Sequence, residues 1–147
     1  MTRIHKTALV SYTVEEMFTI VNGIREYPKF LPWCKSITIH SETGSEIVAT
    51  IKMGGAGLEK AFTTTNVIKE NERIEMRLLK GPFSHLEGDW DFQSLGEDGC
   101  KVSLDLDFHI SNPLLRMSLG PVFSKIANSL VDAFVQRAEE LYGNHSY

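Results

Sequence analysis

This chain of 147 residues has few cysteines, no long apolar run and no excess of positive charge. Its two cysteines, Cys34 and Cys100, are far apart, and a disulfide framework needs more of them in an oxidising compartment. We therefore expect two reduced, half-buried thiols. No apolar run approaches the ~18 residues of a membrane-spanning helix, and charged residues interrupt the N-terminus where a secretion signal would be apolar. These absences favour a cytoplasmic protein.

The charge balance excludes one class of partner. The net charge is −4, whereas a protein that binds DNA through its phosphates presents a strongly basic face. A local basic patch is still compatible with this total. The hydrophobic share of 42% and the mean hydropathy of −0.13 are ordinary for a globular chain, so we expect one domain with a single core over residues 1–147.

The motifs of common catalytic and metal sites are missing as well. The five histidines stand at no metal-ligand spacing with cysteine, aspartate or glutamate on one helix. The glycine-rich stretch 54–57 precedes a strand and lacks the Lys-Ser/Thr ending of a phosphate-binding loop. It is either a hairpin tip or a mobile gate over a cavity. We therefore expect a protein that binds rather than catalyses, with no metal and no cofactor.

Seven stretches have the apolar alternation or the β-branched content that is typical of strands. The last has the cleanest period of two, with apolar residues at every second position from Val102 to Ile110. Short turns separate the last six stretches, so we expect neighbouring strands to pair antiparallel. The predicted strands are residues 4–10, 36–40, 46–53, 58–68, 73–79, 85–92 and 102–110.

Two of these strands carry acidic residues and histidine on one face. They suggest either a carboxylate-rich metal or acid–base site or the solvated side of the sheet. We favour the solvated side, because the opposite face of each strand is apolar. The residues concerned are His85, Glu87, Asp89 and Asp91 on one strand and Asp105, Asp107 and His109 on the other.

Helix signals flank the strands. Thr13 and Glu16 form a capping box that opens a first helix. Pro28 and Pro32 then limit the next segment to one helical turn. Asn112 opens a last helix, which Pro121 is expected to kink or restart. The part from 121 to 142 is ~33 Å long and has a wide apolar face, which includes Leu130, Phe134, Ala138 and Leu141.

That face needs a large apolar partner, and a sheet made from the preceding strands is the one candidate. A long helix across a curved sheet can enclose a cavity, whose wall aromatic and methionine side chains would suit. Met117 is a further candidate for this wall. We predict that the wall contains Trp33, Met53, Phe62, Met76, Trp90, Phe123, Leu130 and Phe134.

Three segments, in this order, resemble the coenzyme-Q-binding START-like family. They are YPKFLPWC (27–34), GPFSHLEGDWDF (81–92) and VFSKIANSLVDAFVQRAEELYG (122–143). Within that family the resemblance points to the bacterial ribosome-association toxin RatA group. It implies an α+β helix-grip fold of the START/Bet v1-like type. In this fold a seven-stranded curved antiparallel sheet is wrapped on a long C-terminal helix, with an apolar cavity between them.

The resemblance implies two functions. The one we favour is non-enzymatic binding of ubiquinone or a related isoprenoid lipid, in support of respiration or quinone biosynthesis and with transient contact at the inner membrane. The alternative is a toxin that binds the large ribosomal subunit and blocks subunit joining. It predicts a basic patch, for which we select Arg25, Lys29 and Lys35. A third hypothesis, a cyclase or dehydratase, needs a titratable group inside the cavity, and such residues are scarce on the inward faces.

Overall fold

The computed structural model describes residues 1–55 and 57–143. All seven predicted strands and the predicted helices are present, and the strand ends lie within two residues of the predicted positions. In chain order the elements are β1 (Thr2–Val10), α1 (Val14–Asn22), η1 (Ile24–Glu26), α2 (Tyr27–Phe30), β2 (Cys34–Glu42), β3 (Glu46–Gly55), β4 (Leu58–Lys69), β5 (Arg73–Lys80), β6 (His85–Ser94), β7 (Cys100–His109) and α3 (Pro113–Tyr142).

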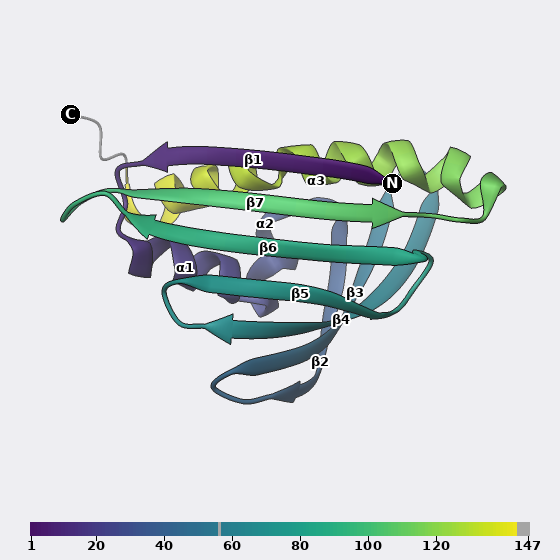
Figure 1. The fold of residues 1–147 in the computed structure, drawn as a ribbon, viewed down its shortest axis with the longest axis horizontal. Coiled ribbons are helices and arrows are strands. Elements are labelled where there is room, and N and C mark those ends of the chain that lie inside the picture. Colours follow the sequence, from purple (N-terminus) through teal and green to yellow (C-terminus); the bar gives the residue numbers. More distant parts are fainter. Residues whose placement is uncertain (56, 144–147) are drawn as a thin grey trace.

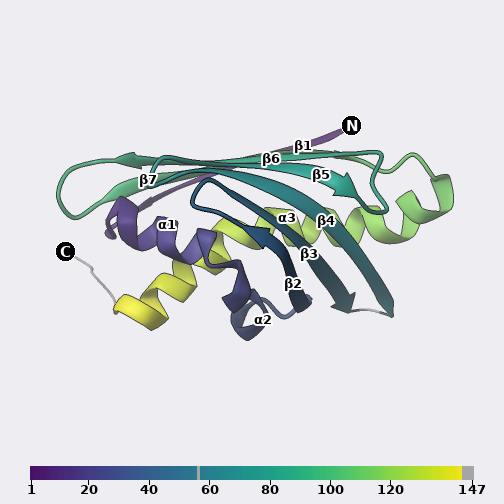
Figure 2. The same ribbon diagram turned by 90° about the horizontal axis from the view of Figure 1, so that it is seen from below.

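The strands form one antiparallel sheet in the order β1-β7-β6-β5-β4-β3-β2. Strands β2 to β7 are a meander, and β1 lies beside β7 at one edge (Figure 1). Viewed from below, β1, β5, β6 and β7 form a nearly flat layer, whereas β4, β3 and β2 curl away from it toward α3 (Figure 2). This curvature leaves a concave face, which α1 and α3 cover.

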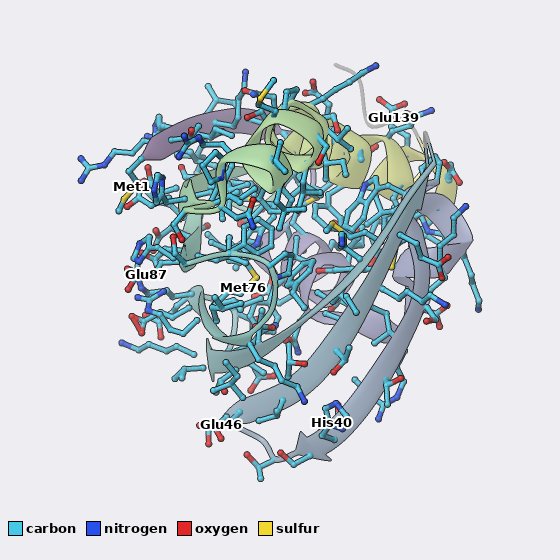
Figure 3. All side chains as sticks on the ribbon, turned by 90° about the vertical axis from the view of Figure 1, so that its right-hand side faces the viewer. Met1, His40, Glu46, Met76, Glu87 and Glu139 are labelled. Atoms are coloured by element: carbon cyan, nitrogen blue, oxygen red, sulfur yellow. The ribbon has the colours of Figure 1, made fainter. Side chains whose placement is uncertain are left out.

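The opposite, convex face is the solvated side of the sheet. Arg73 and Arg77 both approach Asp89, at 3.2 and 3.0 Å, and Arg73 also pairs with Asp91 at 2.6 Å. All four side chains are partly exposed, so these are surface ion pairs of modest energy. Figure 3 shows Glu87 on this outer side of the sheet. The acid-rich strand faces are therefore solvent-facing, as predicted.

Local signals set the ends of the first two helices. Thr13 Oγ1 accepts a hydrogen bond from the Glu16 backbone N–H at 3.1 Å, and Glu16 Oε1 accepts one from the Thr13 N–H at 2.9 Å. This reciprocal pair is the predicted capping box. Pro28 lies in the first turn of α2, which ends at Phe30 before Pro32, so the segment is limited to the predicted single turn.

Helix α3 differs from its prediction in three respects. It continues through Pro121, so the helix does not restart there, and Leu119 and Phe123 on either side of the proline are buried. Leu141, expected on the buried face, is 52% exposed near the end of the helix. Met117, expected in the cavity wall, is 77% exposed. None of the described helices is long and apolar enough to cross a membrane.

Candidate functional site

Helix α3 is attached to the concave face of the sheet through two aromatic clusters. Phe123 packs against Phe83, with ring centroids 4.7 Å apart, and Phe134 packs against Trp90 at 5.2 Å. The two anchors are eleven residues apart, which is ~16 Å along a helix. Between them the helix presents smaller aliphatic side chains, which do not fill the space as rings do. A cavity lies at this position.

The inner cavity has a volume of about 70 Å³ and is almost entirely apolar. Its wall comes from α1, the segment 24–33, strands β3 to β7 and the middle of α3. Seven of the eight predicted wall residues line it. These are Trp33, Phe62, Met76, Trp90, Phe123, Leu130 and Phe134. Figure 3 shows Met76 on the inner side of the curved sheet.

The eighth predicted residue, Met53, lines a second, outer pocket of about 260 Å³. This pocket lies between the ends of β3 and β4 and the α3 segment from Leu119 to Ile126. Trp33 and Ile126 line both pockets, so they form the partition between them. Gly54 and Gly55 end β3 at the rim, as the hairpin prediction expected, while residue 56 of that stretch lies outside the described residues. The geometry is an open vestibule beside a smaller and less open chamber.

The size of the inner cavity limits what enters it without rearrangement. A volume of 70 Å³ corresponds to about two water molecules, whereas sites for small organic ligands usually exceed ~300 Å³. A ligand must therefore displace side chains. Met76 and Leu130 are the half-buried members of the wall with flexible side chains, so they are the residues best able to move.

One polar group that the sequence analysis did not select faces the inner cavity. Asn66 lines it, and the Thr64 hydroxyl donates a hydrogen bond to Asn66 Oδ1 at 3.1 Å. Among the described residues nothing accepts a hydrogen bond from the Asn66 amide nitrogen, so this donor is available to a ligand oxygen. The signal was present in the sequence, because Phe62, Thr64 and Asn66 alternate on one face of a strand.

The tyrosine of the inner wall is already engaged in a hydrogen bond. The hydroxyl of the buried Tyr27 donates a hydrogen bond to the Val21 carbonyl, and burial raises the tyrosine pKa far above its ordinary value. Within residues 1–55 and 57–143, no carboxylate or histidine lines the inner cavity. In the described part of the chain, no three His, Cys, Asp or Glu side chains gather as a metal site would require. The arrangement suits binding of an apolar molecule with one hydrogen-bond acceptor.

The predicted basic patch beside α2 is largely neutralised. Arg25 donates two hydrogen bonds to the Glu42 carboxylate, at 2.8 and 3.1 Å, and Lys29 pairs with Glu26 at 2.5 Å. Of the three selected residues, Lys35 alone has no ion-pair partner among the described residues. These ion pairs reduce the net positive charge of the predicted patch, because a pattern of basic residues does not reveal which carboxylates fold beside them. That this surface binds a partner stays a prediction.

Both cysteines are free and buried, and burial raises the pKa of each to about 11 from an ordinary value of 9.0. A raised pKa means that the folded state prefers the protonated thiol. This preference contributes fully to stability below the thiol pKa of the unfolded chain, and the contribution is lost as pH rises through the thiol pKa of the folded protein. We therefore expect the free energy of unfolding to fall as pH rises from about 9 to about 11. Urea denaturation across this range measures the fall.

The double variant Cys34→Ala, Cys100→Ala is the control for this pH dependence. Its absolute stability will be lower, because two buried side chains are shortened, but its stability should fall less steeply with pH. Part of the fall will remain, since burial also raises the pKa of Tyr12 and Tyr27. An identical slope in both proteins would show that the two thiols do not contribute.

The described residues thus form a curved seven-stranded sheet that encloses an apolar cavity against a long C-terminal helix. This architecture agrees with a comparison of the sequence with protein families. The family described as polyketide cyclase / dehydrase and lipid transport matches residues 10–135. The chain belongs to this family. Members of the START-like superfamily share the helix-grip fold found here, so the predicted fold is confirmed.

Relatives of this chain carry names of more than one kind. The ribosome association toxin RatA of Pseudomonas aeruginosa is 44% identical over 142 residues, which cover 97% of this chain and 99% of that protein. The mitochondrial coenzyme Q-binding protein of Dictyostelium discoideum is 22% identical, over 94% of this chain and 69% of that protein. Full-length similarity is therefore much stronger to the proteins named for the ribosome than to the one named for coenzyme Q.

Solved structures show the same fold in proteins of different kinds. A START superfamily protein from Mycobacterium smegmatis has a TM-score of 0.79 at 23% identity, with 95% of this chain and 98% of that chain covered. The ZhuI aromatase/cyclase of a Streptomyces species has a TM-score of 0.77 at 16% identity, with 94% and 93% covered. The fold thus serves enzymes as well as other proteins, so the function has to be argued from the site.

Proposed function

We propose that this protein associates with the ribosome, by binding the large subunit and blocking subunit joining. The observation that carries the proposal is the 44% identity to the ribosome association toxin RatA of Pseudomonas aeruginosa, which extends over nearly the whole of both chains. Further relatives named RatA, from Escherichia coli and Vibrio cholerae, are 39% and 37% identical over 97% of this chain. We therefore place ribosome association before quinone binding, whereas the sequence alone had favoured quinone binding.

Co-sedimentation with purified ribosomal subunits tests the proposal directly. The protein should pellet with the large subunit through a sucrose cushion and not with the small subunit. Because ribosomal RNA is a polyanion and the chain carries a net charge of −4, binding through a local basic surface should weaken as salt rises. Failure to pellet with either subunit at low salt, or equal pelleting with both, would contradict the proposal.

One charge reversal tests the surface next to the segment 27–34. Lys35 is the unpaired member of the predicted patch, so Lys35→Glu should weaken large-subunit binding about threefold to tenfold. Lys101→Glu is the matched control, because Lys101 lies on the convex face of β7 and has no ion pair among the described residues. Equal binding by both variants would place the contact elsewhere on the protein.

The cavity supports a second candidate function, the binding of an apolar molecule. A largely apolar wall with an available donor on Asn66 suits a chain with one or few oxygen acceptors, and ubiquinone has that chemistry. Binding rather than catalysis is favoured, because the titratable group in the inner wall, Tyr27, is buried and already hydrogen-bonded. The two candidate functions are compatible, since a loaded domain can also dock on a partner.

Native mass spectrometry of the purified protein, followed by organic extraction, tests this second candidate. A stoichiometric quinone or prenyl lipid in the extract would support it. An empty protein that also fails to take up added short-chain ubiquinone would contradict it, and would leave ribosome association as the sole proposed function.

A further inference from the structure

The outer pocket combines an apolar floor with positive charge. Its apolar side chains include Trp33, Met53 and Val122, and its two charged lining residues are both lysines, Lys60 and Lys125. Among the residues that the structure describes, no carboxylate lines it. The net charge of the chain is −4, and three of its nine lysines, Lys29, Lys52 and Lys69, pair with a carboxylate of the described residues.

The two lysines belong to opposite walls of the pocket. Lys60 pairs in register with Met53, which is buried, so its side chain projects from the concave face of β4. Lys125 projects from α3 across the pocket. Neither ammonium has a carboxylate within ion-pair distance among the described residues, whereas neighbouring Lys52 pairs with Glu59 at 2.5 Å. The pocket therefore presents two uncompensated cations around an apolar floor.

We propose that the outer pocket binds the anionic head group of a single-chain amphiphile, whose chain enters the inner cavity between Trp33 and Ile126. The proposal rests on the second candidate function, the binding of an apolar molecule, and specifies its chemical class. Charge complementarity selects a carboxylate or phosphate head over a neutral one. The 260 Å³ vestibule accommodates such a head, and the 70 Å³ inner cavity favours one chain over two.

A pair of ligands that differ only in the head group tests this inference. Farnesyl diphosphate and farnesol share one isoprenoid chain, and their affinities can be compared by isothermal titration calorimetry at low salt. The wild-type protein should bind the diphosphate at least tenfold more tightly, and this preference should shrink as salt rises. The variant K60Q/K125Q should lose most of the preference while its affinity for farnesol stays within about twofold of wild type.

Lys101→Gln is the matched control, since it removes one unpaired positive charge from the convex face of the sheet. It should leave both affinities unchanged. Lys60 and Lys125 are outside the buried core, so thermal unfolding of the unliganded double variant should match that of wild type. This agreement would assign a changed affinity to the lost charges rather than to a damaged fold.

The outcomes separate the proposal from the function on which it rests. Equal binding of both ligands, unaffected by the lysine substitutions, would overturn the anionic head group and leave apolar binding standing. Absence of binding by either ligand would overturn both. Lysine-dependent co-sedimentation with phosphatidylglycerol vesicles, without binding of farnesyl diphosphate, would assign the lysines to a membrane lipid and overturn the free amphiphile.

Discussion

Replacing Phe134 by alanine is expected to lower the free energy of unfolding by about 3–5 kcal/mol, the largest stability effect that we predict for a single substitution. The side chain is 1% exposed, and its ring lies 5.3 Å from Tyr27, 5.8 Å from Phe30 and 5.2 Å from Trp90. Alanine would remove the ring that joins α3 to both the sheet and the segment 27–30. Urea denaturation monitored by circular dichroism measures the change.

Leu141→Ala on the same helix is the control for this loss. Leu141 is 52% exposed, so its truncation should change the free energy of unfolding by no more than about 0.5 kcal/mol. If the two substitutions had similar costs, the aromatic cluster around Phe134 would not anchor the helix. A changed denaturant slope for Phe134→Ala would point instead to an altered unfolded or native state.

Leu130→Asp is expected to reduce the uptake of short-chain ubiquinone by at least about a hundredfold. The side chain lines the inner cavity, and an aspartate there would face an apolar ligand without a partner for its charge. Leu130 is only partly buried, so the new carboxylate can turn toward water in the unliganded protein and the fold should survive. Quenching of tryptophan fluorescence reports uptake, because Trp33 and Trp90 line the cavity.

The same substitution at Leu114 is the matched control. Leu114 is 80% exposed in the first turn of α3 and lines neither pocket, so Leu114→Asp should bind ubiquinone as wild type does. Leu130→Met, which keeps the volume and the apolar character, should also retain uptake. Wild-type affinity in a folded Leu130→Asp protein would contradict the assignment of the cavity as the ligand site.

Local signals in the sequence predicted the elements of this fold well. The period of two in the last strand predicted its buried and exposed faces. The side chains of Val102, Leu104 and Leu106 are each at most 2% exposed. The residues of the Thr13 capping box lie within four positions of each other, so their geometry depends little on the rest of the chain. Such patterns are local, and the backbone that they specify is the one observed.

The errors concern residues whose environment depends on distant parts of the chain. Leu141 and Met117 belong to apolar patterns, but they project beyond the area that the sheet covers. Arg25 was selected for a basic patch, and the sequence pattern did not reveal its partner Glu42, which comes from another element, seventeen residues away. The alternation with Phe62 and Thr64 indicated the face on which Asn66 lies, but its place in the wall of a cavity becomes evident only when β4 is placed opposite α3.

By itself, the sequence determined the order of the elements, their boundaries and which face of most strands is buried, because these follow from short-range periodicity and capping. Only the tertiary structure decided that the enclosed space divides into a 70 Å³ chamber and a 260 Å³ vestibule, and that two unpaired lysines border the vestibule. Cavity volume depends on small gaps between large packed surfaces, and charge compensation depends on which charged side chains meet. They depend on how the curvature of the sheet and the axis of α3 bring together side chains that are far apart in the chain.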